Sequence, residues 1–291
     1  MSPTYDRDNL KLAIPKGRMY EGVMRLLDNA GLGIVSTARN YRPAIAQPGY
    51  EVKLLKPRAI VEMLGEGTRD LGFAGADWVV EGGADIVEIL DTNLDRVRLV
   101  AAAPTGLCEE GRFPDRPIVV ASEYANLARN WIESRKLNAK LLISYGATEV
   151  LPPEDADCII DNTATGATLA ANGLDIIDEI MTSSTRLYAS RFALENPAKR
   201  ERIEQFALLV GSVLEARRRV MLELNVSRDR LDAVVECLPC MREPTVAKLM
   251  SKEGFAVKVA VQKNELPALI PTIKALGGTD IVVTRPEQIV P

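Results

Sequence analysis

The chain has no histidine among its 291 residues. Without imidazole, its own side chains cannot form a Ser-His-Asp or Cys-His catalytic group, a His-ligated zinc site or an imidazole acid–base pair. Cysteine is also scarce, because the sequence contains only Cys108, Cys158, Cys237 and Cys240. These are too few for a disulfide framework in a chain of this size, so we expect reduced thiols.

Cys237 and Cys240 have the CxxC spacing of half a zinc or redox site. A second CxxC pair and histidine are both missing, so these residue types cannot complete a metal site. A plain turn before a strand is the other interpretation, and it needs no further ligands.

The sequence has neither an excess of basic residues nor a long apolar run. Its formal net charge is −4 with 47% hydrophobic residues, which predicts no attraction to nucleic acid or to an anionic membrane. The polar first nine residues, with Asp6, Arg7 and Asp8, are unlike a signal peptide, and no run is long enough for a membrane span. We therefore expect a cytoplasmic protein of about two domains.

What the sequence does contain is a repeated pattern of strand, turn and helix, which is typical of an α/β fold. The first strands are predicted at residues 10–14 and 51–55, each followed by a helix, and residues 71–78 are predicted as a glycine-rich strand end that opens into a helix. The turns place charged residues at strand carboxyl ends, where open α/β sheets bind ligands. These residues are Lys16, Arg18, Lys56, Arg58 and Asp77. Their cations could meet phosphates, although lysine and arginine in loops are also commonly just solvated.

The segment at residues 157–169 predicts a strand that ends in a phosphate-binding turn and a helix N-terminus. The first N–H groups of a helix have no intrahelical partner, and the helix dipole adds positive charge there. Gly166 allows a close backbone approach, and Asp161 could accept hydrogen bonds from ribose hydroxyls. Additional hydroxyl donors come from Thr163, Thr165 and Thr168. An ordinary Thr-capped helix is the alternative interpretation.

The rest of the chain continues this organisation. A strand at residues 97–103 leads to a crossover at 107–117, followed by a second α/β unit with strands at 117–121 and 140–144 and a helix at 124–136. Two strands are then predicted at 176–181 and 186–190, before a long helix at 196–215. From residue 220 the order becomes βαββαβ, as in a ferredoxin-like module, with strands at 220–226, 245–249, 255–261 and 280–283 and helices at 228–237 and 265–276.

Four segments of the chain resemble the long form of ATP phosphoribosyltransferase, the family that begins histidine biosynthesis. The resemblance runs in order from Leu10 to Pro291. The segments are KLAIPKGR (11–18), DLGFAGAD (70–77), DNTATGATLAANGL (161–174) and LPCMREPTV (238–246).

The resemblance implies a two-lobed core like type II periplasmic binding proteins, with a C-terminal ferredoxin-like regulatory domain that binds histidine. The implied boundaries are residues 1–105 for the first lobe, completed by about 186–215, residues 106–185 for the second lobe, and 216–291 for the regulatory domain. The implied reaction transfers phosphoribosyl from phosphoribosyl pyrophosphate (PRPP) to N1 of ATP with Mg²⁺, in a homo-oligomer that exists as dimer and hexamer.

The resemblance also implies roles for individual residues. Lys16, Arg18 and Asp161 would be catalytic. The PRPP site would comprise Asp161, Asn162, Thr163, Ala164, Thr165, Gly166, Ala167, Thr168 and Leu169. The nucleotide would meet Lys16, Arg58, Asp77 and Tyr124, although Tyr124 could equally be a helix-start residue that packs on its lobe. Histidine would meet Asn225, Thr245 and Gly278, and no residue is assigned as a metal ligand.

Two segments depart from the family pattern. The approach to the PRPP loop, residues 151–155, is proline-rich and acidic instead of glycine-rich, and Cys240 replaces a common glycine in the regulatory domain. Three other functions remain open at this point. A solute-binding protein would share the fold, an ordinary phosphoribosyltransferase would carry paired acids before its loop, and a silent regulatory homologue would lack an intact site.

Overall fold

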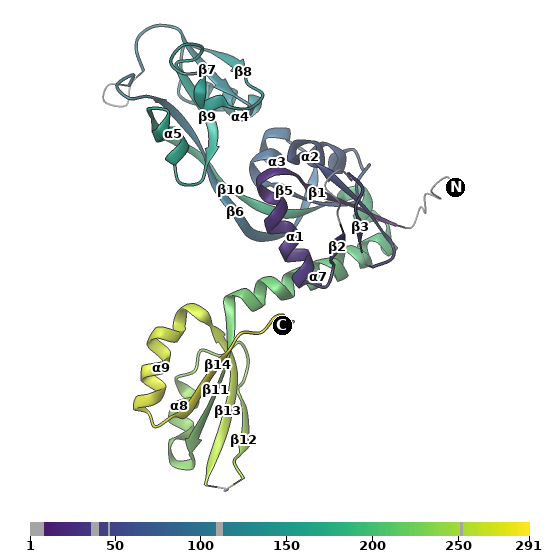
Figure 1. The fold of residues 1–291 in the computed structure, drawn as a ribbon, viewed down its shortest axis with the longest axis vertical. Helices are drawn as coiled ribbons and strands as arrows, with labels where there is room; N and C mark the ends of the chain where they lie inside the picture. Colours follow the sequence, from purple (N-terminus) through teal and green to yellow (C-terminus); the bar gives the residue numbers. More distant parts are fainter. Residues whose placement is uncertain (1–8, 36–40, 46, 109–112, 251–252) are drawn as a thin grey trace. The chain divides into compact units, whose positions relative to one another are not determined.

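The computed structural model describes residues 9–35, 41–45, 47–108, 113–250 and 253–291. The chain divides into two compact units (Figure 1). The first comprises Met1–Asp28 and Leu32–Gln205, and the second comprises Asn29–Gly31 and Phe206–Pro291. The predictions for the first eight residues and for residues 109–112 of the crossover lie outside the described part of the chain.

An eight-stranded mixed sheet of order β4-β1-β5-β10-β6-β9-β7-β8 forms the first unit. One half of it is a parallel set of β1 (Leu10–Pro15), β4 (Tyr50–Leu55) and β5 (Leu71–Gly75). The other half is a second parallel set of β7 (Ile118–Ser122), β8 (Ala139–Ile143) and β9 (Cys158–Thr163). The short strands β2 (Ile34–Val35) and β3 (Ala44–Ile45) pair with each other in a separate antiparallel sheet.

Two long antiparallel strands, β6 (Ile86–Pro104) and β10 (Leu174–Ser190), join the two parallel sets. The prediction of separate strands at 176–181 and 186–190 is wrong, because β10 continues through the intervening Thr-Ser-Ser-Thr segment. The predicted start of the preceding strand at residue 97 is also too late. Register shifts interrupt the ladder at several points, including between Ser183 and Thr185. Such irregularities break the local hydrophobic alternation that strand prediction uses.

Helices follow the parallel strands, as the alternating pattern predicts. They are α1 (Tyr20–Asn29), α2 (Pro57–Gly65), α3 (Ala76–Gly82), α4 (Ala125–Ser134) and the short α5 (Ala167–Ala171). The apolar face of α2 packs on β1 and β5 through Ile60, Val61 and Leu64. In the other half, Leu127, Ala128 and Trp131 of α4 pack against β7 and β9. These two cores hold the strand ends that carry the predicted site residues.

After α6 (Arg191–Glu195), the long α7 (Pro197–Arg218) leads into the second unit. Its antiparallel sheet has the order β12-β13-β11-β14, with β11 (Arg219–Ser227), β12 (Thr245–Lys248), β13 (Gly254–Gln262) and β14 (Thr279–Thr284). Alternate residues of β11 and β13 form one core with Val234 of α8 (Leu231–Glu236) and Leu269 and Ile273 of α9 (Leu266–Ala275). This arrangement confirms the predicted ferredoxin-like βαββαβ module.

Among the described residues, no helix combines the length and the apolar character that a membrane crossing requires.

Candidate active site

The predicted phosphate-binding turn follows β9 and is shaped by its own threonines. The Thr163 hydroxyl oxygen accepts a 3.0 Å hydrogen bond from the Gly166 N–H, and that of Thr165 accepts one of 3.3 Å from the Ala167 N–H. Gly166 has φ +84° at the start of α5, a conformation that costs glycine little. Because α5 has only five residues, its dipole is small, so the turn depends on loop N–H and hydroxyl groups more than the sequence suggested.

This turn borders a cavity of about 250 Å³. Every residue assigned to the PRPP site lines it except Gly166. Two residues from other elements complete the lining, Arg18 from the 3₁₀ turn after β1 (Gly17–Met19) and Glu149 from the 3₁₀ turn Thr148–Val150. The cavity therefore combines the carboxyl end of a strand in one parallel set with a cation from the other set.

Asp161 is the one carboxylate of the cavity that sequence reasoning assigned to it. The pKa of Asp161 is raised to about 6, mainly by burial and also by the negative charges of Glu149 and Glu123, while the Asn162 N–H and Arg18 oppose the shift. The Asn162 N–H donates to Asp161 Oδ1 at 2.7 Å. A carboxylate in this environment accepts hydrogen bonds well, and a nearby ligand cation or hydroxyl would stabilise its ionised form.

Asn162 connects this cavity to a buried network. Its Oδ1 accepts a 3.3 Å hydrogen bond from the Arg18 guanidinium, and its Nδ2 donates to the Tyr124 hydroxyl at 2.9 Å. That hydroxyl donates to Asp77 Oδ2 at 2.6 Å, and the Ser183 hydroxyl donates to Asp77 Oδ1 at 2.7 Å. The network joins the ends of β1, β5, β7 and β9 with the middle of β10.

Asp77 and Tyr124 are both buried, and the Tyr124 ring is stacked on Trp78 with 4.5 Å between ring centroids. Burial is the largest cause of the raised pKa of Tyr124, and the neighbouring Asp77 charge adds to it. The phenol therefore keeps its proton at neutral pH. Tyr124 immediately precedes α4 and packs on its lobe, which was the alternative to its assignment as a nucleotide contact.

The remaining predicted cations do not line this cavity. The Lys16 ammonium lies 3.2 Å from the centroid of the Tyr41 ring, a cation–π contact. Arg58 forms an exposed ion pair with Glu62 on α2, at 3.0 Å. Both follow carboxyl ends of the first parallel set, as predicted, but the structure does not bring them together with Arg18 at the turn.

Sequence reasoning missed Glu149, Ser183 and the contact between Arg18 and Asn162. Glu149 lies two residues before the proline-rich acidic segment 151–155, and the sequence analysis gave it no role. Ser183 belongs to a polar stretch that suggested a break between strands. No local motif marks either residue, because only the fold brings the 3₁₀ turn of Glu149 and the middle of β10 to the site.

The predicted histidine contacts lie in the second unit. Asn225 on β11 donates through Nδ2 to Asp280 Oδ2 at 3.0 Å. Gly278 directly precedes Thr279, which is paired with Asn225, and a Cβ on Gly278 would lie 2.4 Å from Ile273. Thr245 is on β12, which β13 separates from β11. Within one chain the structure thus groups Asn225 with Gly278 and leaves Thr245 apart.

Cys237 and Cys240 lie between α8 and β12, and both thiols are free. This placement agrees with the interpretation of the CxxC as a turn before a strand. No group of three or more histidine, cysteine, aspartate or glutamate residues able to hold a metal ion occurs in the described part of the chain.

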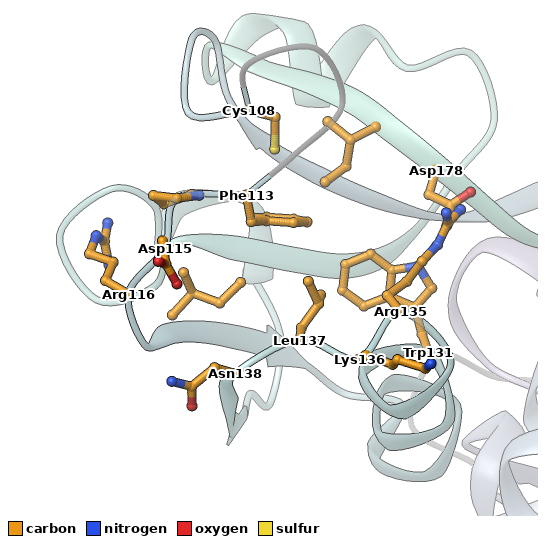
Figure 2. Close-up of a pocket in the computed structure, with 13 residues that line it drawn as sticks. Cys108, Phe113, Asp115, Arg116, Trp131, Arg135, Lys136, Leu137, Asn138 and Asp178 are labelled. Atoms are coloured by element: carbon orange, nitrogen blue, oxygen red, sulfur yellow. The ribbon is translucent and has the colours of Figure 1, made fainter.

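A larger cavity of about 440 Å³ borders β7 and α4 (Figure 2). Its lining includes Phe113 and Trp131, whose rings make an edge contact. Asp178 accepts from both the Trp131 indole N–H and the Arg135 guanidinium, which Figure 2 shows at one side of the cavity. None of the residues predicted for substrate binding lines it. Its two arginines already form ion pairs, Arg116 with Asp157 and Arg135 with Asp178.

The fold and the smaller cavity define a class of protein: an α/β protein with a polar cavity, lined by a guanidinium and threonine hydroxyls, where the carboxyl ends of two parallel strand sets come together. Comparison with known proteins specifies the family. The family described as "HisG: ATP phosphoribosyltransferase" matches residues 56–211, and the one described as "HisG, C-terminal domain" matches residues 216–287.

Curated relatives extend this match to nearly the whole chain. ATP phosphoribosyltransferase of Pelotomaculum thermopropionicum is 34% identical and covers 97% of this chain and 99% of its own. That of Desulforudis audaxviator is 35% identical, with the same coverage. A solved ATP phosphoribosyl transferase (HisG:HisZ) complex from Thermotoga maritima contains a similar chain, with TM-score 0.63, 28% identity and coverage of 71% of this chain and 98% of that one.

The chain belongs to the ATP phosphoribosyltransferase family, in the long form that carries the HisG C-terminal domain. It is a pentosyltransferase that catalyses the first step of histidine biosynthesis. The fold class predicted from the sequence is confirmed, and the family match disfavours the alternative of a solute-binding protein.

Proposed function

We propose that the cavity between Arg18 and the turn after β9 binds the ribose 5-phosphate part of PRPP. The observation that carries this proposal is the lining of the cavity, which combines loop N–H groups, threonine hydroxyls and a guanidinium with the two carboxylates of Asp161 and Glu149. The turn residues 163–169 would hold the phosphate, because backbone N–H groups and hydroxyls are suited to phosphate oxygens. Asp161 would accept hydrogen bonds from the ribose hydroxyls.

Arg18 supplies the positive charge that pyrophosphate departure requires. Its guanidinium can donate to two phosphate oxygens at once, and it already reaches the turn through Asn162. The anomeric carbon becomes oxocarbenium-like as the bond to pyrophosphate breaks. Alignment of the two substrates and stabilisation of the leaving group therefore dominate this reaction. Neither task needs histidine, which the chain lacks.

Mg²⁺ fits this site as a substrate-bound ion. Asp161 and Glu149 are two carboxylates on one cavity, and Mg²⁺ is commonly bound by one or two carboxylates together with substrate phosphates. When bound, the ion would neutralise pyrophosphate charge. The raised pKa of Asp161, due first to burial and then partly to Glu149, is consistent with a pair of carboxylates that a cation would relieve.

We place the ATP-binding site at the carboxyl ends of the first parallel strand set. Lys16 and Arg58 follow β1 and β4, at carboxyl ends of parallel strands, where they would attract the triphosphate. Asp77 and Tyr124 are both buried, so they would support this face from within the protein without contacting the nucleotide. The nucleophile is N1 of adenine, which needs no prior deprotonation.

Regulation and assembly belong to the same proposal. Histidine would bind the second unit near Asn225 and Gly278, with Thr245 contributing from the far edge of the sheet or from another copy of the chain. The long form would then shift from active dimers to inhibited hexamers. Sedimentation velocity with and without histidine tests the assembly.

We also place the enzyme in the cytoplasm, where its substrates and reduced thiols are found.

The reaction is tested by near-ultraviolet absorbance of the purified chain with ATP, PRPP and Mg²⁺, with pyrophosphatase added to draw the reaction forward. A rise in absorbance that needs both substrates supports the transferase, and suppression by histidine supports the regulatory role of the second unit. If PRPP binds but no rise occurs with ATP present, the catalytic proposal is wrong, and a binding protein or silent homologue replaces it.

A further inference from the structure

The hydrogen bonds around Asn162 have a fixed direction that originates outside the cavity. At one end, Asp77 is a carboxylate that accepts from the hydroxyls of Ser183 and Tyr124. At the other end, the Arg18 guanidinium can only donate. Asn162 lies between them and has one accepting oxygen and one donating nitrogen. Its amide must therefore match both neighbours.

Tyr124 transmits the direction from Asp77 to Asn162. A phenol has a single proton, and here it is directed to Asp77 Oδ2 at 2.6 Å. The phenol oxygen can then only accept from Asn162, so Nδ2 of that amide faces it at 2.9 Å. Oδ1 consequently faces the Arg18 guanidinium at 3.3 Å. A flipped amide would place two donors against each other at Arg18 and would leave the phenol oxygen without its donor.

The surrounding packing holds the two inner members of this network in place. Tyr124 is fully buried and stacked on Trp78, so its ring has little freedom. Gly75 leaves space for the Asp77 carboxylate, because a Cβ at that position would lie 2.1 Å from Asp77 Oδ1. The second hydroxyl on the carboxylate comes from Ser183, which bonds Oδ1, whereas Tyr124 bonds Oδ2.

We propose that the Asp77–Tyr124 pair is a positioning relay that sets the orientation of the Asn162 amide, and through it the orientation of Arg18 toward PRPP. Asp77 and Tyr124 act in this relay without touching PRPP. The relay rests on the proposed function, since it assigns a purpose to Asn162 and Arg18 within the PRPP cavity. It also couples the two strand sets, because β5 and β1 contribute one end each and β7 and β9 contribute the middle.

The first test is Tyr124→Phe in the full chain, which keeps the ring stacked on Trp78 and removes only the hydroxyl. The Asn162 amide then loses its fixed orientation, and we expect the KM for PRPP to rise about three- to tenfold. The KM for ATP should change less than twofold. An unchanged KM for PRPP in a folded, active variant would overturn the relay while leaving the transferase assignment intact.

Ser183→Ala is the matched control. It removes the other buried hydroxyl from the same carboxylate, at nearly the same distance, but that hydroxyl has no contact with Asn162. We expect a lower melting temperature and a KM for PRPP within twofold of the wild type. If both variants raise this KM equally, loss of stability explains the effect and the relay is wrong.

A double-mutant cycle asks whether Tyr124 acts through Asn162. In an Asn162→Ala background, which itself weakens PRPP, the further change Tyr124→Phe should have no additional effect on the KM for PRPP. An equal effect in both backgrounds contradicts the relay. If wild-type enzyme shows no transfer from PRPP to ATP, the proposed function fails first, and the two failures are thereby distinguished.

If Tyr124→Phe does not fold, NMR of the wild-type chain keeps the proposal testable. The side-chain amide signals of Asn162 are assigned by their loss in Asn162→Ala. The relay predicts a nuclear Overhauser contact between these amide protons and the Tyr124 ring, and slow exchange with solvent. Absence of that contact together with exchange as fast as in a free amide would overturn it.

Discussion

Individual threonines of the turn differ in how much of their hydrogen bonding the protein already uses. The hydroxyl oxygens of Thr163 and Thr165 accept from N–H groups of their own loop, so each hydroxyl has its proton left for a ligand. Thr168 is exposed on the cavity wall. Its hydroxyl can therefore both donate to and accept from a bound phosphate and its water.

Thr168→Val tests the turn directly. The change keeps the shape of the side chain and removes its hydroxyl, so a donor to a charged phosphate is lost. A hydrogen bond to a charged group contributes about 1.5–3 kcal/mol, and we expect the KM for PRPP to rise at least about tenfold while the KM for ATP changes little. Steady-state kinetics checks this.

Thr272→Val is the control for that experiment. Its hydroxyl donates within α9 to the Ala268 carbonyl in the second unit, so neither KM should change. Comparable losses for PRPP and ATP in Thr168→Val would contradict the assignment of the turn to PRPP.

Asp161 predicts a pH-dependent contribution to stability. Burial raises the pKa of Asp161 from 3.8 to about 6, so the folded state binds its proton more tightly than the unfolded chain does. Its contribution to stability is therefore full below pH 3.8 and declines as pH rises to about 6, above which the ionised group destabilises the fold. Asp161→Asn should stabilise the free enzyme at pH 7.5 and have a smaller effect at pH 4.5.

Urea unfolding of both proteins at the two pH values measures this difference. A gain in unfolding free energy that is the same at pH 4.5 and pH 7.5 would show that ionisation of Asp161 is not its cause. The same variant should lose PRPP affinity at pH 7.5, because an amide accepts hydrogen bonds from ribose less strongly than a carboxylate.

At the scale of elements, α4 begins against a side chain from α3. Both carboxylate oxygens of Glu81 accept from the Asn126 N–H at 3.0 Å, and one also accepts from the Leu127 N–H at 3.0 Å. The first N–H groups of a helix lack intrahelical partners, and the positive end of its dipole favours an anion. Glu81 therefore caps a helix of the second parallel set from a helix of the first.

Glu81→Ala should lower the free energy of unfolding by about 1–3 kcal/mol, because it leaves buried N–H groups without an acceptor. Urea denaturation measures the change. Glu133→Ala is the control, since Glu133 is exposed in the last turn of α4, and its effect should be within about 0.5 kcal/mol. Equal effects of the two changes would contradict the cap.

The short elements of the core were predicted well because each strand–turn–helix repeat is local. Hydrophobic spacing and the glycines and prolines at the turns determine β1, α2 and β5 within a few residues. β6 and β10 were predicted poorly because their middle parts are polar and irregular in register. Their continuity depends on pairing with each other along most of their length, which is a tertiary interaction.

At the scale of the whole molecule, the C-terminal unit is the basis for feedback regulation. Its residues form a separate core around β11, β13, α8 and α9, as expected for a module that can be added to a catalytic core. Deletion of residues 216–291 should abolish inhibition by histidine. Enzyme assays with and without histidine measure it, and circular dichroism confirms that the truncated protein is folded.

Asn225→Ala in the full chain accompanies this deletion. It should weaken inhibition by histidine without changing the KM for PRPP, because Asn225 lies in the second unit. A truncated, folded protein that histidine still inhibits would place the effector site elsewhere in the chain.

The sequence by itself determined the α/β class, the βαββαβ module, the threonine-rich turn and the absence of catalysis or metal binding by histidine side chains. Each depends on residue composition or on patterns within about one strand–turn–helix unit. Tertiary structure alone decided that Arg18 meets Asn162 across 144 positions of sequence, that Tyr124 is buried against Asp77, and that Glu149 joins the cavity. These contacts arise where the ends of distant strands come together, and strand order is set by long-range packing that no local pattern encodes.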